Sequence, residues 1–464
     1  MKALPFLLRR LRELGAVDAW RVESLAKDGI LTLSDLQLAF AEQRPIAADP
    51  LLRRAGAALA EERRQLTLGR SWEVLEMLLA EISGKIPDLE TLEASGGVRR
   101  FEPLPQDLVV VGRTADPSTA AAALARLPIF NEVIHRAERR LIVLFQGHEL
   151  DVRLATRDEF GTLLFTTTGP PDHVAQVQRR RGPRLCATEA DVYAQAGLRY
   201  QPPEVRGSDA LEAVVPPLVT REDIRGDLHM HTTYSDGSDS LREMVAACCA
   251  LGYEYIAITD HSERAAAGRT LDARSLERQR NEIARVREQF PQIAILHGIE
   301  ADILEDGTID CPDDTMASLD IVLASLHERG RDSGRRLTER CIQAIQHPLV
   351  SVITHPQNQL VGRRSGYDMD YDAIYEAAAA TGAALEIDGA PAHLDLDGAH
   401  SRAAVTRGVT VTIDSDCHRA QWLDRQMRLG IGTARRGWVE ARQVLNTRSL
   451  GEIRAFVARK RGTA

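Results

Sequence analysis

Seven short apolar runs recur through the second half of the sequence, each followed by a polar cluster and then a helix-like stretch. The runs are GDLHMH, YIAITDH, IAILHGIEAD, DIVLASLH, VSVITHP, GAALEIDG and GVTVTIDSDCH. Parallel strands require long connections, usually helical, and stretches such as SLREMVAACCALG fit that role. The pattern therefore predicts an α/β fold in which parallel strands close into a barrel or a strongly curved sheet.

Nearly every one of these runs ends in a side chain that can bind a metal ion. In α/β barrels the functional groups gather at the carboxyl ends of the strands. Alternate residues of a strand share a face, so the H-x-H and D-x-H pairs can each chelate an ion. Nine candidate ligands exceed the needs of one ion and suit two or three ions that share a bridging carboxylate. The candidates are His229, His231, Asp236, His261, Glu300, His327, His355, Asp416 and His418.

A single histidine near a strand end is more often a hydrogen-bonded structural residue than a metal ligand. The coincidence of ligand types at successive strand ends outweighs that default and favours a metal cluster. The other seven of the 13 histidines, among them His135, His148 and His173, are interpreted as structural.

Residues 1–205 have a different pattern of apolar residues from the second half. Residues 1–90 repeat apolar positions every three or four residues, as in SWEVLEMLLAEI, and predict a helical region. Residues 91–205 carry the strand-like runs DLVVVG, RLIVLFQG and HELDVRLA with helices between, and predict a small mixed α/β domain. A proline-rich linker over 206–222 leads to the barrel of 223–464.

Composition excludes several classes of function. The 464 residues carry a formal net charge of −9, so the chain is not a basic nucleic-acid clamp and any DNA binding must use a local patch. None of the six cysteines belongs to a C-x-x-C pair, and no apolar stretch is long enough to span a bilayer. We expect a reduced, cytoplasmic monomer that does not bind membranes.

The second half resembles a PHP (polymerase and histidinol phosphatase) domain in the motifs GDLHMHTTYSDG, AITDHS, GIEADI, ASLHE, THP, LEIDGAP and IDSDCH. Two further segments, GRRSGYDMD and TARRGWVEARQVLNTRSLGEI, resemble the PHP domain of bacterial family X DNA polymerases. The resemblance covers residues 223–464. It implies a distorted seven-stranded (β/α) barrel with a trinuclear site for two or three divalent ions, manganese or zinc.

The resemblance also assigns the ligands. It implies that one ion is held by His229, His231, Glu300 and Asp416. Glu300 bridges to a second ion held by His327 and His355, and the third is held by Asp236, His261 and His418.

Such ions can generate hydroxide from water at neutral pH and clamp the oxygens of a phosphate ester. We expect Asp227 to orient an imidazole rather than to bind an ion. Asp388 stands where the family motif LEINANP has its asparagine, which would alter substrate positioning without removing a ligand. Arginine makes bidentate phosphate contacts, and the candidates are Arg363, Arg364, Arg435 and Arg436.

The first half resembles the rest of a family X polymerase, with losses. The segment LRELGAVDAWRVESLAKDGILTLSDL resembles a helix-hairpin-helix element but lacks the G-x-G that admits a DNA phosphate. Asp107 and Asp151 align with two polymerase carboxylates, whereas Val109 stands at the third position, and the glycine-serine turn of the nucleotide segment is replaced. We also expect no complete lyase domain in these residues. We expect a degenerate palm and thumb over 91–205, inactive as a polymerase.

The expected function is that of a metal-dependent phosphoesterase, by resemblance a 3′–5′ exonuclease or 3′-end-processing enzyme in DNA repair that acts on DNA. One alternative is a small-molecule phosphatase of the histidinol-phosphate type, which would release phosphate from that ester and leave an oligonucleotide intact. A second is a non-catalytic DNA-binding scaffold, whose biological activity would survive replacement of His229 and His231 by alanine.

Overall fold

The computed structural model describes residues 4–62, 66–86, 88–182, 184–207, 211–265, 270–327 and 332–463. The chain divides into two compact units, residues 1–214 and 215–464. The first unit contains the helical and mixed α/β regions distinguished in the sequence, and the second contains the repeated apolar runs.

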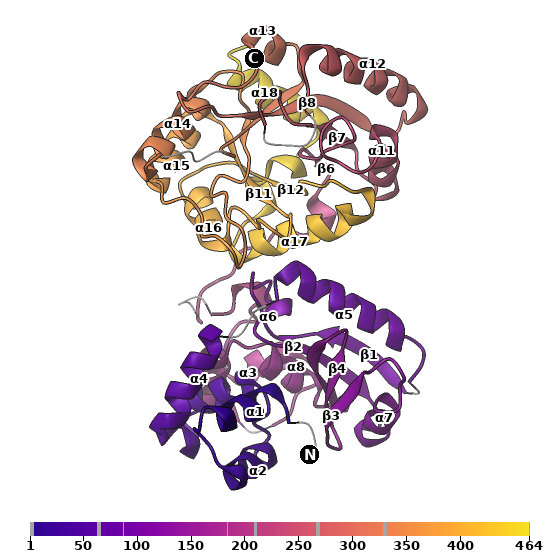
Figure 1. Ribbon diagram of the computed structural model, residues 1–464, viewed down its shortest axis with the longest axis vertical. Coiled ribbons are helices and arrows are strands. Elements are labelled where there is room, and N and C mark those ends of the chain that lie inside the picture. Colours follow the sequence, from indigo (N-terminus) through magenta and orange to yellow (C-terminus); the bar gives the residue numbers. More distant parts are fainter. Residues whose placement is uncertain are drawn as a thin grey trace. The chain divides into compact units, whose positions relative to one another are not determined.

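The second unit is built on seven parallel strands that curve into a nearly closed barrel (Figure 1). They pair in chain order and are β6 (Gly226–Asp227), β7 (Tyr255–Ile258), β8 (Ala294–Asp302), β9 (Ile321–Ser325), β10 (Val352–Ile353), β11 (Ala384–Asp388) and β12 (Val411–Asp414). Each apolar run of the sequence forms one strand, which confirms the predicted α/β barrel.

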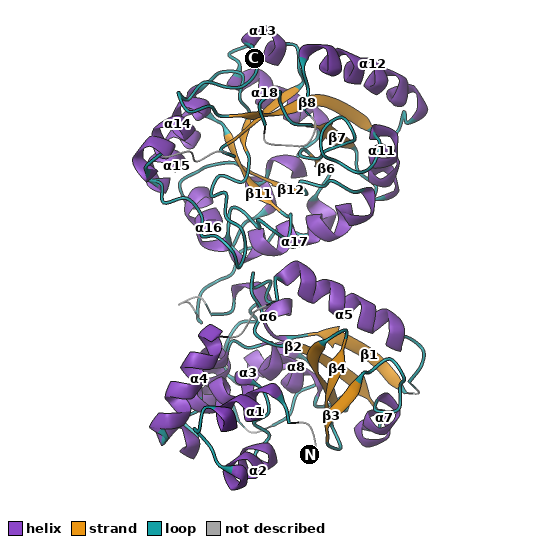
Figure 2. Cartoon of the chain, viewed as in Figure 1, coloured by secondary structure: helices purple, strands orange, loops and turns teal. Residues whose placement is uncertain are grey.

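Helices surround the barrel strands (Figure 2). Both faces of the strands are buried, as in other parallel sheets: Ile256 and Ile258 pack in one core cluster with Met244, and Tyr255 and Ala257 pack in another. This double burial explains the continuous apolar runs. The helices are α11 (Leu241–Ala250), α12 (Ala273–Gln289), α13 (Asp313–Ala317), α14 (Gly334–Gln346), α15 (Tyr371–Thr381), α16 (Gly398–Thr406), α17 (Leu423–Arg436) and α18 (Leu450–Lys460).

The first unit begins with five helices that bury one face each. In the first of them Leu7, Leu8 and Leu11 are buried at helical spacing, and the third is closed at its start by a capping box between Thr32 and Asp35. The helices are α1 (Phe6–Glu13), α2 (Ala19–Lys27), α3 (Leu33–Ala41), α4 (Pro50–Glu62) and α5 (Leu68–Ile82).

A five-stranded sheet follows in the order β1-β2-β5-β4-β3. Its strands are β1 (Leu89–Ala94), β2 (Leu108–Thr114), β3 (Glu132–Arg136), β4 (Arg140–Phe145) and β5 (His148–Ala155). The sequence predicted β2, β4 and β5. It did not predict the edge strands β1 and β3, which have no continuous apolar run and, apart from Ala94, are half-buried or exposed. The helices between and after them are α6 (Gly96–Arg99), α7 (Pro117–Leu124), α8 (Phe160–Thr168), α9 (Pro171–Arg180) and α10 (Glu189–Gln195).

Two smaller features bear on the expectations from composition. None of the six cysteines forms a disulfide, and Cys186, Cys248, Cys341 and Cys417 are buried. In the described part of the chain, no helix combines the length and apolarity needed to cross a bilayer.

Candidate metal centre

The nine side chains expected as metal ligands come together at the carboxyl ends of the barrel strands. Seven of them line an open cavity of about 250 Å³, together with Ala265 and His393. The remaining two, His229 and His231, have no exposed surface and pack against the others. His355 and Asp416 hold positive φ angles of 26° and 47°, a strained backbone of the kind that concentrates at functional sites.

Glu300, on β8, stands at the centre of the cluster and is fully buried. Its two oxygens face different imidazoles, as those of a bridging carboxylate do. The nitrogens nearest to Oε2 are His261 Nδ1 at 2.9 Å and the Nε2 atoms of His229 and His231, both at 3.5 Å. The nitrogens nearest to Oε1 are His355 Nε2 at 3.0 Å and His327 Nε2 at 3.4 Å.

The segment after β6 is held in place by Asp260, a fully buried carboxylate just beyond β7. Asp260 accepts hydrogen bonds from the backbone amides of Thr232 and Ser235 at 2.8 and 3.0 Å. The resulting turn brings Asp236 back toward the cavity, where its Oδ1 lies 3.2 Å from His418 Nε2. One carboxylate that is not itself a candidate ligand thus positions Asp236, which is one.

Three imidazoles of the cluster have their Nδ1 atom fixed by an acceptor. The contacts are His229 Nδ1 with Glu386 Oε1 at 2.7 Å, His327 Nδ1 with Asp302 Oδ1 at 2.5 Å, and His418 Nδ1 with the Asp416 carbonyl at 2.9 Å. Because a carboxylate or carbonyl oxygen only accepts, each Nδ1 carries the proton, and Nε2 keeps its lone pair for a ligand in the cavity.

Glu386, on β11, has the role that the sequence analysis gave to Asp227, and that expectation was wrong. The Asp227 carboxylate accepts hydrogen bonds from the backbone amides of Ser415 and His229, at 3.2 and 3.4 Å. Because β6 ends at Asp227 itself, the chain turns there, and this side chain faces the backbone that follows β12 instead of an imidazole. Glu386 could not be recognised from the sequence, since it is one more residue of a buried strand.

Burial and the neighbouring charges together set the pKa values of the cluster. Burial lowers the pKa of His231 to about 4, and the neighbouring His418 and His261 add to this effect. Burial would also lower the pKa of His261, but Glu300 and Asp236 outweigh it and raise that pKa to about 11. Burial would raise the pKa of Glu300, yet the surrounding imidazoles, His261 foremost, hold it well below its ordinary value. The central carboxylate is therefore ionised, as metal binding requires.

The described residues provide four groups whose ligand atoms lie within 4.8 Å of one another. Three of the groups consist of expected ligands: His231, Asp236, His261 and His418; His229, His231 and Asp416; and His261, Glu300 and His327. Imidazole nitrogens mixed with carboxylate oxygens suit zinc or manganese, so the residues present fit divalent ions of this kind. The fourth group is Asp388, His393 and Asp416.

The four arginines expected to bind phosphate lie elsewhere. Arg364 donates to the carbonyl and the side-chain oxygen of Asn358, both at 2.8 Å, and Arg435 donates to the Val219 carbonyl at 3.0 Å. Among the described residues, those that line the cavity include no arginine. The structure does not bring to it Arg363, Arg364, Arg435 or Arg436, so their phosphate contact stays a prediction.

His393 was missed because it was grouped with the structural histidines. It lies in the loop after β11, lines the cavity and stacks on His355 with ring centroids 5.3 Å apart. Its place just after the sixth apolar run was the signal that could have identified it.

Asp107 and Asp151, which the resemblance aligns with two polymerase carboxylates, lie in the first unit, and both are engaged by other residues. Asp107 Oδ2 accepts hydrogen bonds from the backbone amide and the hydroxyl of Ser34, at 3.0 and 2.5 Å. Asp151 Oδ2 lies 2.8 Å from Arg140 and 2.7 Å from Arg153.

The same two arginines also bind Asp35 on α3, at 2.6 and 2.7 Å. We call Asp35, Arg140, Asp151 and Arg153 the arginine network. Burial would raise the pKa of Asp35, but Arg153 and Arg140 outweigh it and hold the pKa well below its ordinary value. Two guanidinium groups thus neutralise the Asp35 and Asp151 carboxylates together.

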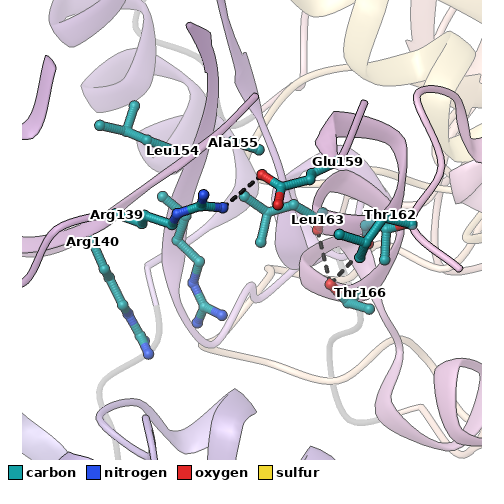
Figure 3. A pocket seen from close by; sticks show the side chains of 10 residues that line it. Arg139, Arg140, Leu154, Ala155, Glu159, Thr162, Leu163 and Thr166 are labelled. Atoms are coloured by element: carbon teal, nitrogen blue, oxygen red, sulfur yellow. Dashed lines mark hydrogen bonds and ion pairs between the residues drawn. The ribbon is translucent and has the colours of Figure 1, made fainter. Parts of the chain in front are cut away.

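A second cavity, of about 330 Å³, lies beside this network (Figure 3). Arg139 and Glu159 form an ion pair of 2.6 Å in its wall. Thr166 Oγ1 donates to the carbonyls of Thr162 and Leu163, both at 3.0 Å. These polar groups of the wall are thus bound to other protein groups.

Comparison with known proteins gives consistent matches. Residues 227–380 match the family model of the PHP domain. The DNA polymerase/3′-5′ exonuclease PolX of Bacillus subtilis is 37% identical over 394 residues, which cover 79% of this chain and 68% of the relative. A probable phosphatase of Caldanaerobacter subterraneus is 30% identical over 203 residues, 41% of this chain and 75% of the relative. A crystal structure of histidinol phosphate phosphatase from Lactococcus lactis, complexed with zinc, L-histidinol and phosphate, has a TM-score of only 0.38 at 19% identity, over 47% of this chain and 94% of that one.

The barrel and the matched family model together define the second unit as a PHP domain, a phosphoesterase and thus a hydrolase. The whole-chain similarity goes further: the chain belongs to the bacterial family X DNA polymerases that carry a C-terminal PHP domain. Both statements agree with the resemblance in the sequence motifs.

Proposed function

We propose that the protein is a metal-dependent phosphoesterase that processes the 3′ ends of DNA, acting as a 3′–5′ exonuclease in DNA repair. The observation that carries this proposal is the gathering of nine ligand-type side chains at one site, seven of which line an open cavity while His229 and His231 pack behind them. The relative named as a 3′-5′ exonuclease supports the choice of DNA as substrate. Two or three manganese or zinc ions suit the mixture of imidazoles and carboxylates.

When bound, divalent ions lower the pKa of water and neutralise the oxygens of a phosphate ester. The side chains of this protein prepare that chemistry. Glu300 would hold two of the ions together through its two oxygens, as the bridging ligand. Glu386 and Asp302 keep Nδ1 of His229 and His327 protonated, so that both rings present Nε2 to the ions.

The size of the cavity bears on the substrate. Its volume of about 250 Å³ is below the range of roughly 300–1,000 Å³ that encloses a drug-sized ligand. The cavity therefore suits a phosphoryl group and the atoms next to it, with the rest of the substrate outside. The end of a DNA strand fits this arrangement.

The test of the proposal is degradation of an oligonucleotide labelled at its 5′ end, in the presence of Mn²⁺ or Zn²⁺. We expect products that shorten progressively from the 3′ end, and no products after the metal is removed with a chelator, because the reaction needs the ions. A strand whose last linkage is a phosphorothioate is the matched control and should be shortened more slowly. An oligonucleotide that stays intact in all metal conditions would refute the exonuclease.

A small-molecule phosphatase is the second candidate, because similar proteins are named probable phosphatases and the cavity is small. The two candidates differ in one measurement. Release of inorganic phosphate from histidinol phosphate, with no shortening of the oligonucleotide, would favour the small-molecule phosphatase. A non-catalytic scaffold would give neither product.

We further propose that residues 91–205 are inactive as a polymerase and serve to position DNA. Nucleotidyl transfer needs clustered carboxylates that hold two ions. Here Asp151 is bound by two arginines, Asp107 by Ser34, and Val109 has no carboxylate.

A templated primer-extension assay with Mn²⁺ tests this proposal. We expect no incorporation, because the arginines occupy the carboxylate that an ion would need. Efficient extension that persists in the His229→Ala variant, where the PHP domain is altered, would show that the polymerase site is intact.

A further inference from the structure

His393 is placed to act as more than a structural residue. Its Nδ1 atom lies 3.0 Å from the Gln359 carbonyl, which only accepts, so Nδ1 carries the proton and Nε2 has a free lone pair. This is the arrangement shared by His229, His327 and His418, whose Nδ1 atoms are also bound to acceptors. His393 is thus prepared as a metal ligand in the same way.

Asp388, at the end of β11, is a buried carboxylate with a hydrogen bond to only one of its two oxygens among the described residues. Its side chain has no exposed surface. One oxygen, Oδ1, accepts a hydrogen bond of 2.5 Å from the Ala390 amide, whereas Oδ2 has no hydrogen-bond partner among the residues the structure describes. A buried carboxylate oxygen without a partner is costly, and a bound cation is one of the few ways to offset that cost.

Asp416 completes the group. Ligand atoms of Asp388, His393 and Asp416 all lie within 4.8 Å of one another, a spacing that one ion can span. When both carboxylates are ionised, they and a neutral imidazole carry a charge of about −2, which matches a divalent cation. We propose that these three residues form an additional site for a divalent ion of the Mn²⁺ type, with Asp416 shared between this site and the group of His229 and His231.

Two features separate this site from the nine-ligand set. Neither Asp388 nor His393 belongs to that set, and the position of Asp388 is an asparagine in the family motif LEINANP. An amide oxygen supplies no negative charge, so the additional ion depends on the aspartate of this chain. Carboxylate oxygens favour manganese over softer ions, and the open cavity leaves the remaining coordination positions to water or substrate oxygens.

This inference rests on the proposed metal centre, and counting bound ions separates the two. The full-length protein and the variants Asp388→Asn and His393→Gln are equilibrated with MnCl₂, freed of excess metal and subjected to elemental analysis. We expect each variant to bind about one ion fewer per chain than the wild type. Circular dichroism of the metal-free proteins establishes that both variants are folded, and Asp388→Asn restores the residue of the family motif.

His347→Ala is the control, because His347 ends α14 and faces Asp313 outside the cavity. It should bind as many ions as the wild type. Equal metal content in the wild type and in both cavity variants would refute the additional site and leave the main centre standing. A wild-type protein that binds no Mn²⁺ would refute the proposed metal centre as well.

Discussion

Replacing Glu300 by glutamine is expected to lower phosphodiester hydrolysis by more than about 100-fold, the upper end of the loss seen when a residue that supports a metal ligand is removed. The reason is geometric. The Glu300 oxygens face two sets of imidazoles, with closest approaches of 2.9 Å to His261 and 3.0 Å to His355. An amide keeps the shape of the side chain but has one oxygen and no charge, so it cannot serve both sets.

The measurement is the initial rate with a labelled oligonucleotide, repeated with bis(p-nitrophenyl) phosphate as a small diester. Glu254→Gln is the matched control, since Glu254 is half-exposed and pairs with Arg225 at 2.6 Å far from the cavity lining. It should retain the wild-type rate. A Glu300→Gln variant that stays within a few-fold of the wild type would show that Glu300 is not a metal-bridging residue.

The second large effect is on stability. Arg153→Met is expected to destabilise the first unit by about 3–5 kcal/mol, because removing one member of a buried ion network leaves an uncompensated charge. The side chains of Arg153 and Asp151 are 18% and 2% exposed. Without Arg153, Asp35 and Asp151 share Arg140 alone, and the first unit keeps one buried negative charge in excess.

Hydrogen exchange in the full-length protein measures this effect, followed in peptides from residues 1–214. Arg113→Met is the control, because its ion pair with Glu90 is about one-third exposed and should contribute no more than about 1 kcal/mol. The pKa of Asp35 is lowered in the folded protein. Its contribution is therefore present above about pH 4, the ordinary pKa of an aspartate, and is lost as the pH falls. Equal protection in the two variants would contradict a stabilising network.

The nine candidate ligands could be predicted from the sequence because residues at the carboxyl ends of different barrel strands lie close together in space. Parallel strands of one barrel all end at the same rim, so residues as distant as His229 and His418 meet once each run is recognised as a strand. No knowledge of side-chain contacts was needed for that step.

The residues that orient these ligands could not be predicted in the same way. Glu386 and Asp302 are acidic residues on buried strands, and only the tertiary structure shows that they bind the Nδ1 atoms of His229 and His327. Asp227 was misassigned because the two-residue alternation of a strand was assumed to continue from Asp227 to His229. In the structure β6 ends at Asp227, so the two side chains do not share that alternation.

The arginine network was equally hidden from the sequence. It joins Asp35 of α3 to Arg140 of β4, 105 residues away, and to Asp151 and Arg153 of the neighbouring strand β5. The resemblance aligned Val109 with a carboxylate position, but the sequence did not indicate that two arginines bind Asp151.

Glu386 has a further consequence through its second oxygen. Oε1 binds the His229 ring, while Oε2 accepts a hydrogen bond of 2.8 Å from the backbone amide of His355. These two histidines lie just after β6 and β10, and their ring centroids are 6.1 Å apart. A single carboxylate of β11 therefore ties the ring of one candidate ligand to the backbone of another, so that the barrel strand itself links two parts of the metal centre.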